Sequence, residues 1–168
     1  MVTGNRYRAL NSLPESAFHD GKLLYTFDQL NTHYAWDCGV AIGEYLAKLR
    51  EGIIIGATCS HCHRTMVPPR LFCEYCFRPI KNFIPLQDTG TILTFSLCYV
   101  TWDVQRIEIP EIPAVIAIDG ASENHGILHK IGEVDPHAVH IGMRVKAVWK
   151  TPEERSGDIT DILYFRPE

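Results

Sequence analysis

The stretch CSHCHRTMVPPRLFCEYC, residues 59–76, decides the fold of this chain of 168 residues. It contains two C-x-x-C hooks, Cys59 to Cys62 and Cys73 to Cys76, separated by ten residues. Each hook can supply two thiolates to one side of a tetrahedral ion. Two hooks on a short hairpin complete a four-sulfur site of the kind that structural zinc prefers. We therefore predict a zinc ribbon with ligands Cys59, Cys62, Cys73 and Cys76.

Other uses of these cysteines compete with a zinc site. Disulfides are disfavoured because no N-terminal stretch resembles a signal peptide, and no apolar run approaches the roughly eighteen residues of a membrane span. We expect a reducing, cytoplasmic compartment and no membrane partner. Rubredoxin-type iron, and His61 or His63 in place of one cysteine, remain alternatives. A closed four-cysteine site leaves no position for water or substrate, so we expect the metal to hold the fold.

The residues that follow each hook, and the two cysteines outside the hooks, differ from the usual zinc-knuckle pattern or lie apart from it. His63 and Phe77 follow the second cysteine of each hook, where zinc knuckles usually carry a glycine with positive φ. Because a bulky residue adopts that conformation less readily than histidine does, we expect some strain at the second hook. Cys38 and Cys98 lie outside the hooks in apolar stretches, and we expect both to be small buried hydrophobic residues.

The charge of the chain is unevenly distributed. Hydrophobic residues make up 46% and charged residues 21% of the sequence, which is typical of a globular protein, and the net charge is −4. Residues 59–82 carry four Lys/Arg and one Asp/Glu, a net charge of +3. Residues 83–168 carry seven Lys/Arg and thirteen Asp/Glu, a net charge of −6. Only the cysteine hairpin is basic.

A helix is predicted before the cysteine hairpin, from about Leu30 to Arg50, with Gly52 at its C-terminal end. Gly39 and Gly43 interrupt this helix and allow another backbone to approach, either from the protein's own domains or from a partner. Residues 1–27 show no periodicity, so we expect this arm to become ordered only by docking. The helix prediction rests on apolar residues at helical spacing, namely Tyr34, Cys38, Ala41, Ile42, Tyr45, Leu46 and Leu49.

The remainder of the chain has the alternation of strands. Along residues 91–101, Leu93, Phe95, Leu97 and Tyr99 alternate with smaller or polar residues, and a loop containing Trp102, Pro110 and Pro113 follows. A short turn or helix at 135–141 separates the third strand from the fourth. This order predicts a Greek-key barrel of the OB type. Its five strands are expected at residues 91–101, 114–119, 126–132, 143–150 and 158–165.

An OB barrel suggests nucleic-acid binding, but this sequence disfavours it. A non-specific single-strand groove is expected to be basic, whereas the barrel segment is acidic. The second and third strands contain no aromatic residue on which bases can stack. Catalysis is not indicated either, because Cys98 and Ser96 lack the neighbours of a nucleophile. Asp135, His137 and His140 are interpreted as solvated turn residues and not as an acid–base or second metal cluster.

The order of these parts resembles a known family. The residues concerned are Leu49–Gly52 before the first hook, Pro68-Pro69-Arg70 between the hooks, Thr89-Gly90 at the first strand, Pro113, Asp119-Gly120, Ile141–Val145 and Tyr164–Pro167. Over roughly residues 34–167 the chain is similar to the two-domain zinc-ribbon/OB-fold proteins known as a domain of unknown function and associated with acyl-CoA metabolism.

The resemblance implies a mainly β fold with an N-terminal helix, in which a rubredoxin-like zinc ribbon precedes a five-stranded OB-fold barrel. We expect three segments: an arm and helix (residues 1–52), the ribbon (53–82) and the barrel (83–168). Family members are small non-catalytic subunits of thiolases, hydroxymethylglutaryl-CoA synthases or related thiolase-fold enzymes. There they bridge enzyme subunits and help to form the channel that holds CoA.

The charges of the hairpin fit such a role. CoA brings phosphates, and the candidate cationic contacts are Arg64, Arg70, Arg78 and Lys81. The same charges are also compatible with ordinary solvated surface. The interpretation is a zinc-binding accessory subunit that shares CoA or acyl-CoA with a thiolase-fold enzyme. The alternative is a free-standing module with an OB fold that binds acyl-CoA or nucleic acid.

Overall fold

The computed structural model describes residues 16–21, 33–101 and 103–168. By its contacts the chain divides into two units, residues 1–36 and 37–168. In the first unit, helix α2 spans Ser16–His19, and the rings of Tyr34 and Trp36 lie 6.4 Å apart. The prediction of an arm ordered by docking falls mostly outside the described residues, as do Trp102 and the expected helix start at Leu30.

Helix α3 spans Gly39–Glu51, so the prediction of a helix through residues 34–38 was wrong. Tyr34 is 76% exposed, and Cys38, which was expected to be buried, is exposed as well. Gly39 has a φ of +67°, which favours glycine, and its N–H donates to the Asp37 carboxylate at 2.8 Å. Gly39 therefore marks the start of the helix and does not interrupt it.

The C-terminal end of α3 confirms the expectation for Gly52. This residue has a φ of 80°, and its N–H donates to the carbonyl of Leu49 at 2.8 Å, while the N–H of Ile53 donates to Lys48 at 2.9 Å. A left-handed glycine at this position satisfies carbonyls that the helix itself leaves free. The chain turns there directly into the cysteine hairpin.

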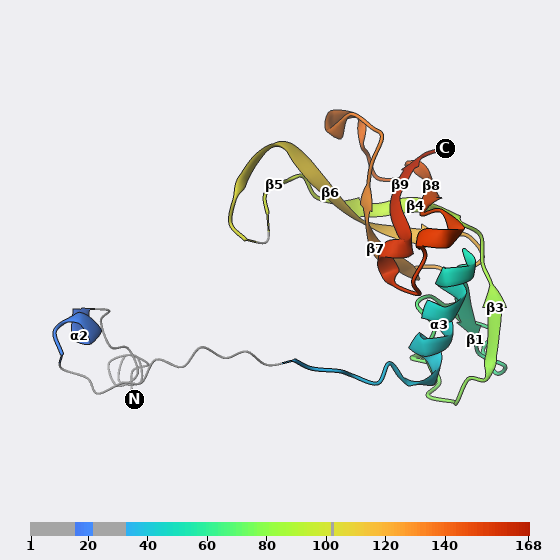
Figure 1. Ribbon diagram of the computed structural model, residues 1–168. Coiled ribbons are helices and arrows are strands. Elements are labelled where there is room, and N and C mark those ends of the chain that lie inside the picture. Colours follow the sequence, from blue (N-terminus) through green and yellow to red (C-terminus); the bar gives the residue numbers. More distant parts are fainter. Residues whose placement is uncertain (1–15, 22–32, 102) are drawn as a thin grey trace, which may run out of the picture. The chain divides into compact units, whose positions relative to one another are not determined.

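The ribbon is a small antiparallel sheet that carries the two hooks on its loops. Strands β1 (Ile55–Thr58), β2 (Thr65–Met66) and β3 (Asn82–Pro85) are arranged in the order β2-β1-β3. The first strand begins at Ile55, two residues later than the predicted start at Ile53. Figure 1 shows the sheet beside α3 at one end of the barrel.

Five strands close the barrel and confirm the predicted OB fold. They are β4 (Thr89–Phe95), β6 (Arg106–Ile118), β7 (Gly126–Ile131), β8 (Arg144–Trp149) and β9 (Ile162–Pro167). The sheet runs β4-β8-β9-β7-β6 and returns to β4, with β7 and β9 parallel and every other pair antiparallel. The expected insert before β8 is the short 3₁₀ helix η1, Pro136–Ala138.

The predicted first strand is divided and bulged. The register between β4 and β6 shifts between Ile92 and Thr94, so Leu93 is the extra residue of a bulge. Because a bulge reverses the alternation, Ile92 is buried before it, and Phe95 packs against the core after it, while Leu93 is exposed. The prediction that Leu93 faces inward with Phe95 was therefore wrong.

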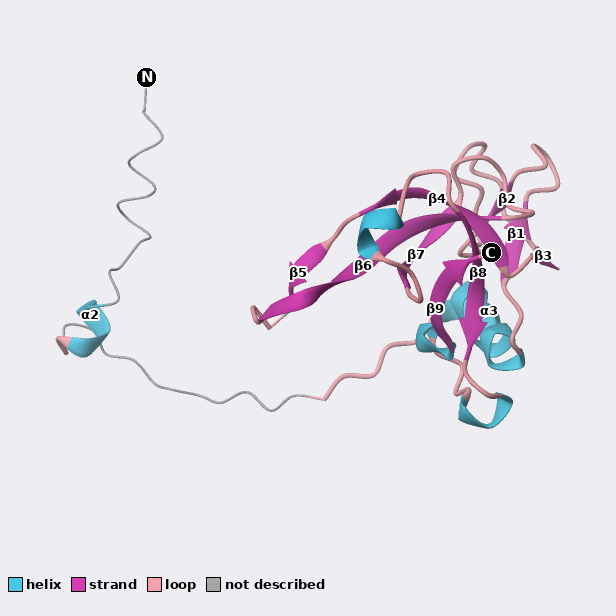
Figure 2. Cartoon of the chain, turned by 90° about the horizontal axis from the view of Figure 1, so that it is seen from above, coloured by secondary structure: helices cyan, strands magenta, loops and turns pink. Residues whose placement is uncertain are grey.

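The expected proline loop is part of the long strand β6. Near Pro110 the pairing with β5 (Cys98–Val100) is irregular, so the missing N–H interrupts no regular ladder there. The carbonyl of Pro113 accepts the N–H of Ser96 at 3.0 Å. The first half of β6 and strand β5 form a hairpin that projects from the barrel in both views (Figures 1 and 2).

One core joins the helix, the ribbon base and the barrel. The buried side chains of Tyr45 and Leu49 in α3 and of Ile54 after it belong to the same cluster as Ile92 and Phe165 of the barrel. The last helical segment, η3 (Ile159–Asp161), lies against α3 and precedes β9, so the predicted strand start at Asp158 was too early. A second, smaller cluster lies under the hooks and consists of Ala57, Cys59, Met66, Cys73 and Ile80.

Candidate metal centre

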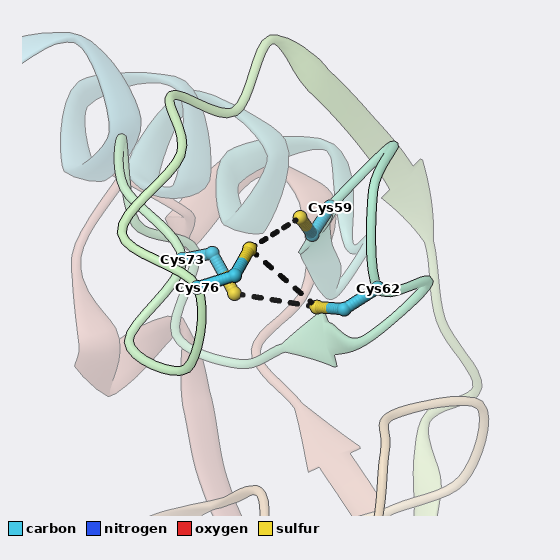
Figure 3. Close-up of side chains that lie close together, drawn as sticks. All are labelled: Cys59, Cys62, Cys73 and Cys76. Carbon is cyan, nitrogen blue, oxygen red and sulfur yellow. Dashed lines mark hydrogen bonds between the residues drawn. The ribbon is translucent and has the colours of Figure 1, made fainter.

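The two hooks bring four cysteine sulfur atoms together at the tip of the ribbon. All four Sγ atoms of Cys59, Cys62, Cys73 and Cys76 lie within 4.8 Å of one another. The separations are 3.5 Å for Cys59 to Cys76, 3.5 Å for Cys62 to Cys73, and 3.9 Å for Cys62 to Cys76 (Figure 3). Among the described residues this is the one group with metal-ligating geometry.

These separations fit a tetrahedral ion and exclude disulfides in this structure. Zinc–sulfur bonds of about 2.3 Å place tetrahedral sulfur atoms about 3.8 Å apart, whereas a disulfide requires about 2.05 Å. The cysteines are free. Four soft sulfur donors around one centre also favour zinc over harder cations, which prefer oxygen ligands.

The two hooks share one backbone conformation. The N–H of Cys59 donates to the carbonyl of Arg64 at 2.8 Å, and that of His63 to Cys59 at 2.9 Å. In the second hook the N–H of Cys73 donates to Arg78 at 2.9 Å, and that of Phe77 to Cys73 at 2.9 Å. His63 and Phe77 have φ values of 58° and 56°, as expected for positions where glycine is usual.

Backbone amides in each turn point at sulfur. The N–H groups of Cys62 and His61 lower the pKa of the Cys59 thiol to about 6, and the N–H of Cys76 lowers the pKa of Cys73. Burial raises the pKa of the Cys76 thiol to about 12. Because four thiolates in so small a space need an opposite charge, the site is suited to a divalent cation that holds all four deprotonated.

The ribbon is held to the barrel by side chains as well as by the shared core. Ser122, in the loop after β6, accepts the N–H of Thr65 through its hydroxyl at 2.9 Å and donates its own N–H to the Thr65 carbonyl at 2.9 Å. His125 is buried, and its Nε2 lies 3.3 Å from a carboxylate oxygen of Glu74 in the second hook. These contacts fix the position of the metal-binding tip relative to the barrel.

The four basic residues predicted to contact CoA differ in their surroundings. The guanidinium of Arg64 lies over the ring of Tyr75, 4.3 Å from its centre, and Arg70 pairs with Glu74 at 2.6 Å. Arg78 and Lys81 are exposed, and no ion pair involves either of them within the described part of the chain. The structure therefore leaves Arg78 and Lys81 the more available cations.

The other polar residues singled out in the sequence have local contacts. The carboxylate of Asp135 accepts the N–H of His137 at 3.0 Å, and Nδ1 of His140 lies 3.0 Å from the carbonyl of Ala138. These are the contacts of a capped turn. Cys98 is half-buried in β5. None of the helices in the described ranges has the length and hydropathy that a membrane crossing requires.

The sequence analysis named Phe77 only for its backbone conformation and did not identify the group of exposed apolar side chains around the second hook, Leu71, Phe72, Tyr75 and Phe77. Their signal was present in the sequence, because three aromatic residues surround a hook whose buried positions are already taken by cysteines. The four cysteine sulfur atoms converge without a histidine among them. That neither His61 nor His63 is a metal ligand stays a prediction.

A four-cysteine ribbon that shares its core with a closed five-stranded barrel defines a class of two-domain zinc-ribbon/OB-fold proteins. Two family models match in this order, the rubredoxin-like zinc ribbon domain of ChsH2 over residues 46–81 and its C-terminal OB-fold domain over residues 83–150. A DUF35 domain-containing scaffold protein of Methanocaldococcus jannaschii is 32% identical over 118 residues, 68% of this chain and 81% of that protein. The chain belongs to the DUF35 family.

Further relatives agree with this assignment. A DUF35 domain-containing scaffold protein of Methanothermobacter thermautotrophicus is 27% identical over 119 residues, 68% of this chain and 86% of that protein. The crystal structure of a DUF35 protein from Sulfolobus solfataricus is 25% identical, with a TM-score of 0.59 over 77% of this chain and 84% of that one. The Ltp2–ChsH2(DUF35) aldolase shares the fold, at 18% identity and a TM-score of 0.54. The match covers 74% of this chain and 91% of that one.

Proposed function

We propose that this chain is a non-catalytic, zinc-binding scaffold subunit of a thiolase-type enzyme that processes acyl-CoA. The observation that carries the proposal is the similarity to a scaffold protein. The two chains are 32% identical, and the match covers 81% of the scaffold protein. The similar fold in the Ltp2–ChsH2(DUF35) aldolase supports it, because that name makes ChsH2 the DUF35 component of an aldolase. The partner is accordingly a thiolase-fold subunit, and this chain bridges subunits of the enzyme.

Zinc bound by Cys59, Cys62, Cys73 and Cys76 has a structural role in this proposal. Four protein ligands leave no open coordination position, so the ion supplies no water or Lewis acid to a reaction. Its contribution is to hold the two hooks at the end of the ribbon. The common core and the pair of hydrogen bonds between Thr65 and Ser122 support a rigid connection to the barrel, which a bridging subunit requires.

The ribbon is also proposed to help form the channel for CoA. Its net charge of +3 suits the phosphates, whereas the barrel has a net charge of −6. Arg78 and Lys81 are the residues most available for these contacts. Arg64 and Arg70 are partly engaged by Tyr75 and Glu74, so their contribution is expected to be smaller.

Reconstitution with the co-encoded or co-purifying thiolase-fold enzyme tests the proposal. We expect no turnover of acyl-CoA by the chain alone, and a loss of activity or of subunit arrangement when the enzyme is purified without it. The double change Arg78→Glu and Lys81→Glu is expected to raise the apparent KM for acyl-CoA several-fold while the complex stays intact. Lys146→Glu makes the same kind of charge change on the barrel and serves as the control.

Two results would contradict the proposal. One is turnover of acyl-CoA by the purified chain. The other is a partner enzyme that keeps full activity and the same subunit arrangement without it. An unchanged KM in the double variant would contradict only the CoA contacts.

A further inference from the structure

The second hook presents an unusual amount of apolar surface for so small a ribbon. Leu71, Phe72, Tyr75 and Phe77, called here the aromatic knuckle, are exposed by 40%, 61%, 68% and 81%. Four large apolar side chains thus lie in solvent within seven consecutive residues. Single exposed apolar residues are ordinary on protein surfaces, but a group of this size indicates an interaction site.

The first hook provides an internal control for what the metal centre needs. Both hooks make the same pair of backbone hydrogen bonds, and the residue after the second cysteine has the same φ in each. At matched positions, however, the first hook carries His61 and His63 where the second carries Tyr75 and Phe77. Since polar residues serve the first hook, holding the metal does not require aromatic residues in the second.

Phe77 is costly for the isolated chain in two respects. A φ of 56° is unfavourable for a bulky residue, and glycine relieves that strain. Its ring is also 81% exposed, so within this chain little apolar burial compensates for the strain. Strained residues of this kind persist at functional sites, where the benefit comes from another molecule.

We infer that the aromatic knuckle is the surface with which this chain docks on its thiolase-type enzyme partner, with Phe77 inserted into the partner. The inference rests on the proposed function and names the contact surface. Aromatic residues and arginine are enriched at the centres of protein interfaces. The guanidinium of Arg64 lies over the ring of Tyr75 and suits an acidic group at the edge of an apolar pocket on the enzyme, whereas Arg78 and Lys81 are left for CoA.

A protein is a better occupant of this surface than the nucleotide of CoA. An adenine base stacks on one or two rings, whereas four exposed apolar side chains offer more surface than a base covers. Small-molecule sites are concave and enclose their ligand, and side chains exposed to 61–81% do not line such a cavity. Cations next to the aromatic knuckle remain free to contact CoA phosphates at the edge of the interface.

Matched glycine substitutions in the two hooks test this inference. Phe77→Gly and His63→Gly make the same backbone change at equivalent positions. Both are expected to keep zinc and a melting temperature at or above that of the wild type, because glycine favours this φ. Binding to the co-encoded thiolase-fold enzyme, measured by calorimetry or interferometry, is expected to weaken at least tenfold for Phe77→Gly and less than twofold for His63→Gly.

A second variant guards against damage to the metal centre. Phe77→His copies the first hook, where histidine occupies the same φ, and is expected to weaken binding at least tenfold with full zinc content. If either Phe77 variant loses zinc, Phe72→Ser, outside the turn, provides the measurement. Zinc-loaded Phe72→Ser with weakened binding supports the inference, and wild-type binding overturns it.

The outcomes separate the inference from the proposed function. If the wild-type chain binds the enzyme and Phe77→Gly and Phe77→His bind equally well, the inference is overturned and the proposed function stands. Titration of CoA into the isolated chain measures its affinity for CoA. If Phe77→Gly lowers that affinity but leaves enzyme binding unchanged, the surface is a nucleotide site and the inference is also overturned. A wild-type chain that does not bind the enzyme removes the proposed function and the inference with it.

Discussion

Cys73, the first cysteine of the second hook, is completely buried and belongs to the small cluster that fills the ribbon. Structural zinc sites in zinc-finger peptides contribute about 10–16 kcal/mol of apparent binding free energy at neutral pH, so we expect the ribbon to depend on a bound zinc for folding. The barrel has its own buried residues but shares a core with Ile54 and Val67 of the ribbon base. Loss of the metal should therefore unfold the ribbon and weaken the barrel without unfolding it.

We expect Cys73→Ser to lose its zinc, because a serine hydroxyl does not replace a thiolate ligand. The zinc content, measured by metal analysis, should fall from one zinc per chain to near zero. Thermal unfolding should occur at a lower temperature, and the NMR resonances of the barrel should stay dispersed. Cys98→Ser, which lies outside the group, is the control and should keep its zinc. A metal-free wild-type chain, or full zinc in Cys73→Ser, would show that the ligand assignment is wrong.

Asp161 is the one fully buried carboxylate among the described residues. It accepts the N–H groups of Ser156, Gly157 and Asp158 at 3.0, 2.7 and 3.1 Å, and Lys150 lies 3.8 Å away. Burial alone would raise its pKa, but these N–H groups and the ammonium outweigh burial and hold the pKa below its ordinary value. The stabilisation is therefore complete above about pH 4, the unfolded pKa, and is lost as pH falls through the lowered folded pKa.

We predict that Asp161→Asn lowers the free energy of unfolding at pH 7 by about 1.5–3 kcal/mol, the usual cost of losing hydrogen bonds to a charged group. The variant should also lose less stability than the wild type between pH 4 and pH 2. Urea unfolding across this range measures both effects. Asp88→Asn, a more exposed carboxylate, is the control. Equal acid sensitivity in Asp161→Asn and wild type would exclude this role.

At the scale of elements, helix α3 leaves open space beside one of its glycines, Gly43. A Cβ built on Gly43 meets no atom within 4 Å, and the same holds for Gly39. The interpretation that these glycines allow the protein's own domains to pack closely is therefore not supported by the described residues. The positive φ of Gly39 already accounts for glycine at the helix start, and a partner surface, the other interpretation, stays a prediction for Gly43.

We expect Gly43→Ala to raise the free energy of unfolding by about 0.5–1 kcal/mol, because glycine is that much less favourable than alanine in a helix. Gly43→Leu should also keep zinc and folding but weaken the complex with the thiolase-fold enzyme. Thermal unfolding and the binding assay used for Phe77 measure the two effects. Gly43→Leu with unchanged affinity would place this side of the helix outside the interface.

At the scale of the whole molecule, charge separates the ribbon from the barrel. The net charge is +3 over residues 59–82 and −6 over residues 83–168. Non-specific nucleic-acid binding is mainly an effect of phosphate neutralisation, so an acidic barrel opposes it. In contrast, an acidic surface is compatible with a protein partner.

We therefore predict that oligonucleotides bind no tighter than about 10⁻⁴ M at physiological salt. Fluorescence anisotropy with single-stranded DNA and RNA, repeated at low and high salt, measures this. Ribbon variants with Arg78→Glu serve to show whether any residual binding comes from the basic tip. A micromolar, salt-sensitive affinity for single strands would restore nucleic acid as the partner.

The amino-acid sequence by itself determined the features that depend on neighbours along the chain. The spacing of the two hooks predicted the sulfur group, because the four cysteines lie within eighteen residues. Gly52 predicted the helix end through its left-handed conformation, and strand periodicity with turn residues predicted the five-stranded barrel. The strain expected at Phe77 is likewise a local property and is present as a φ of 56°.

Only the tertiary structure decided the features that depend on distant segments. The bulge at Leu93 arises from pairing with β6, and Pro110 and Pro113 lie in a strand because their partners tolerate the missing N–H. Gly90 is required because a Cβ there would overlap the Ala117 carbonyl of the neighbouring strand. The exposure of Phe77 and of Cys38 was decided in the same way. Burial depends on which segments cover a residue, and the pattern of its neighbours along the chain does not contain that information.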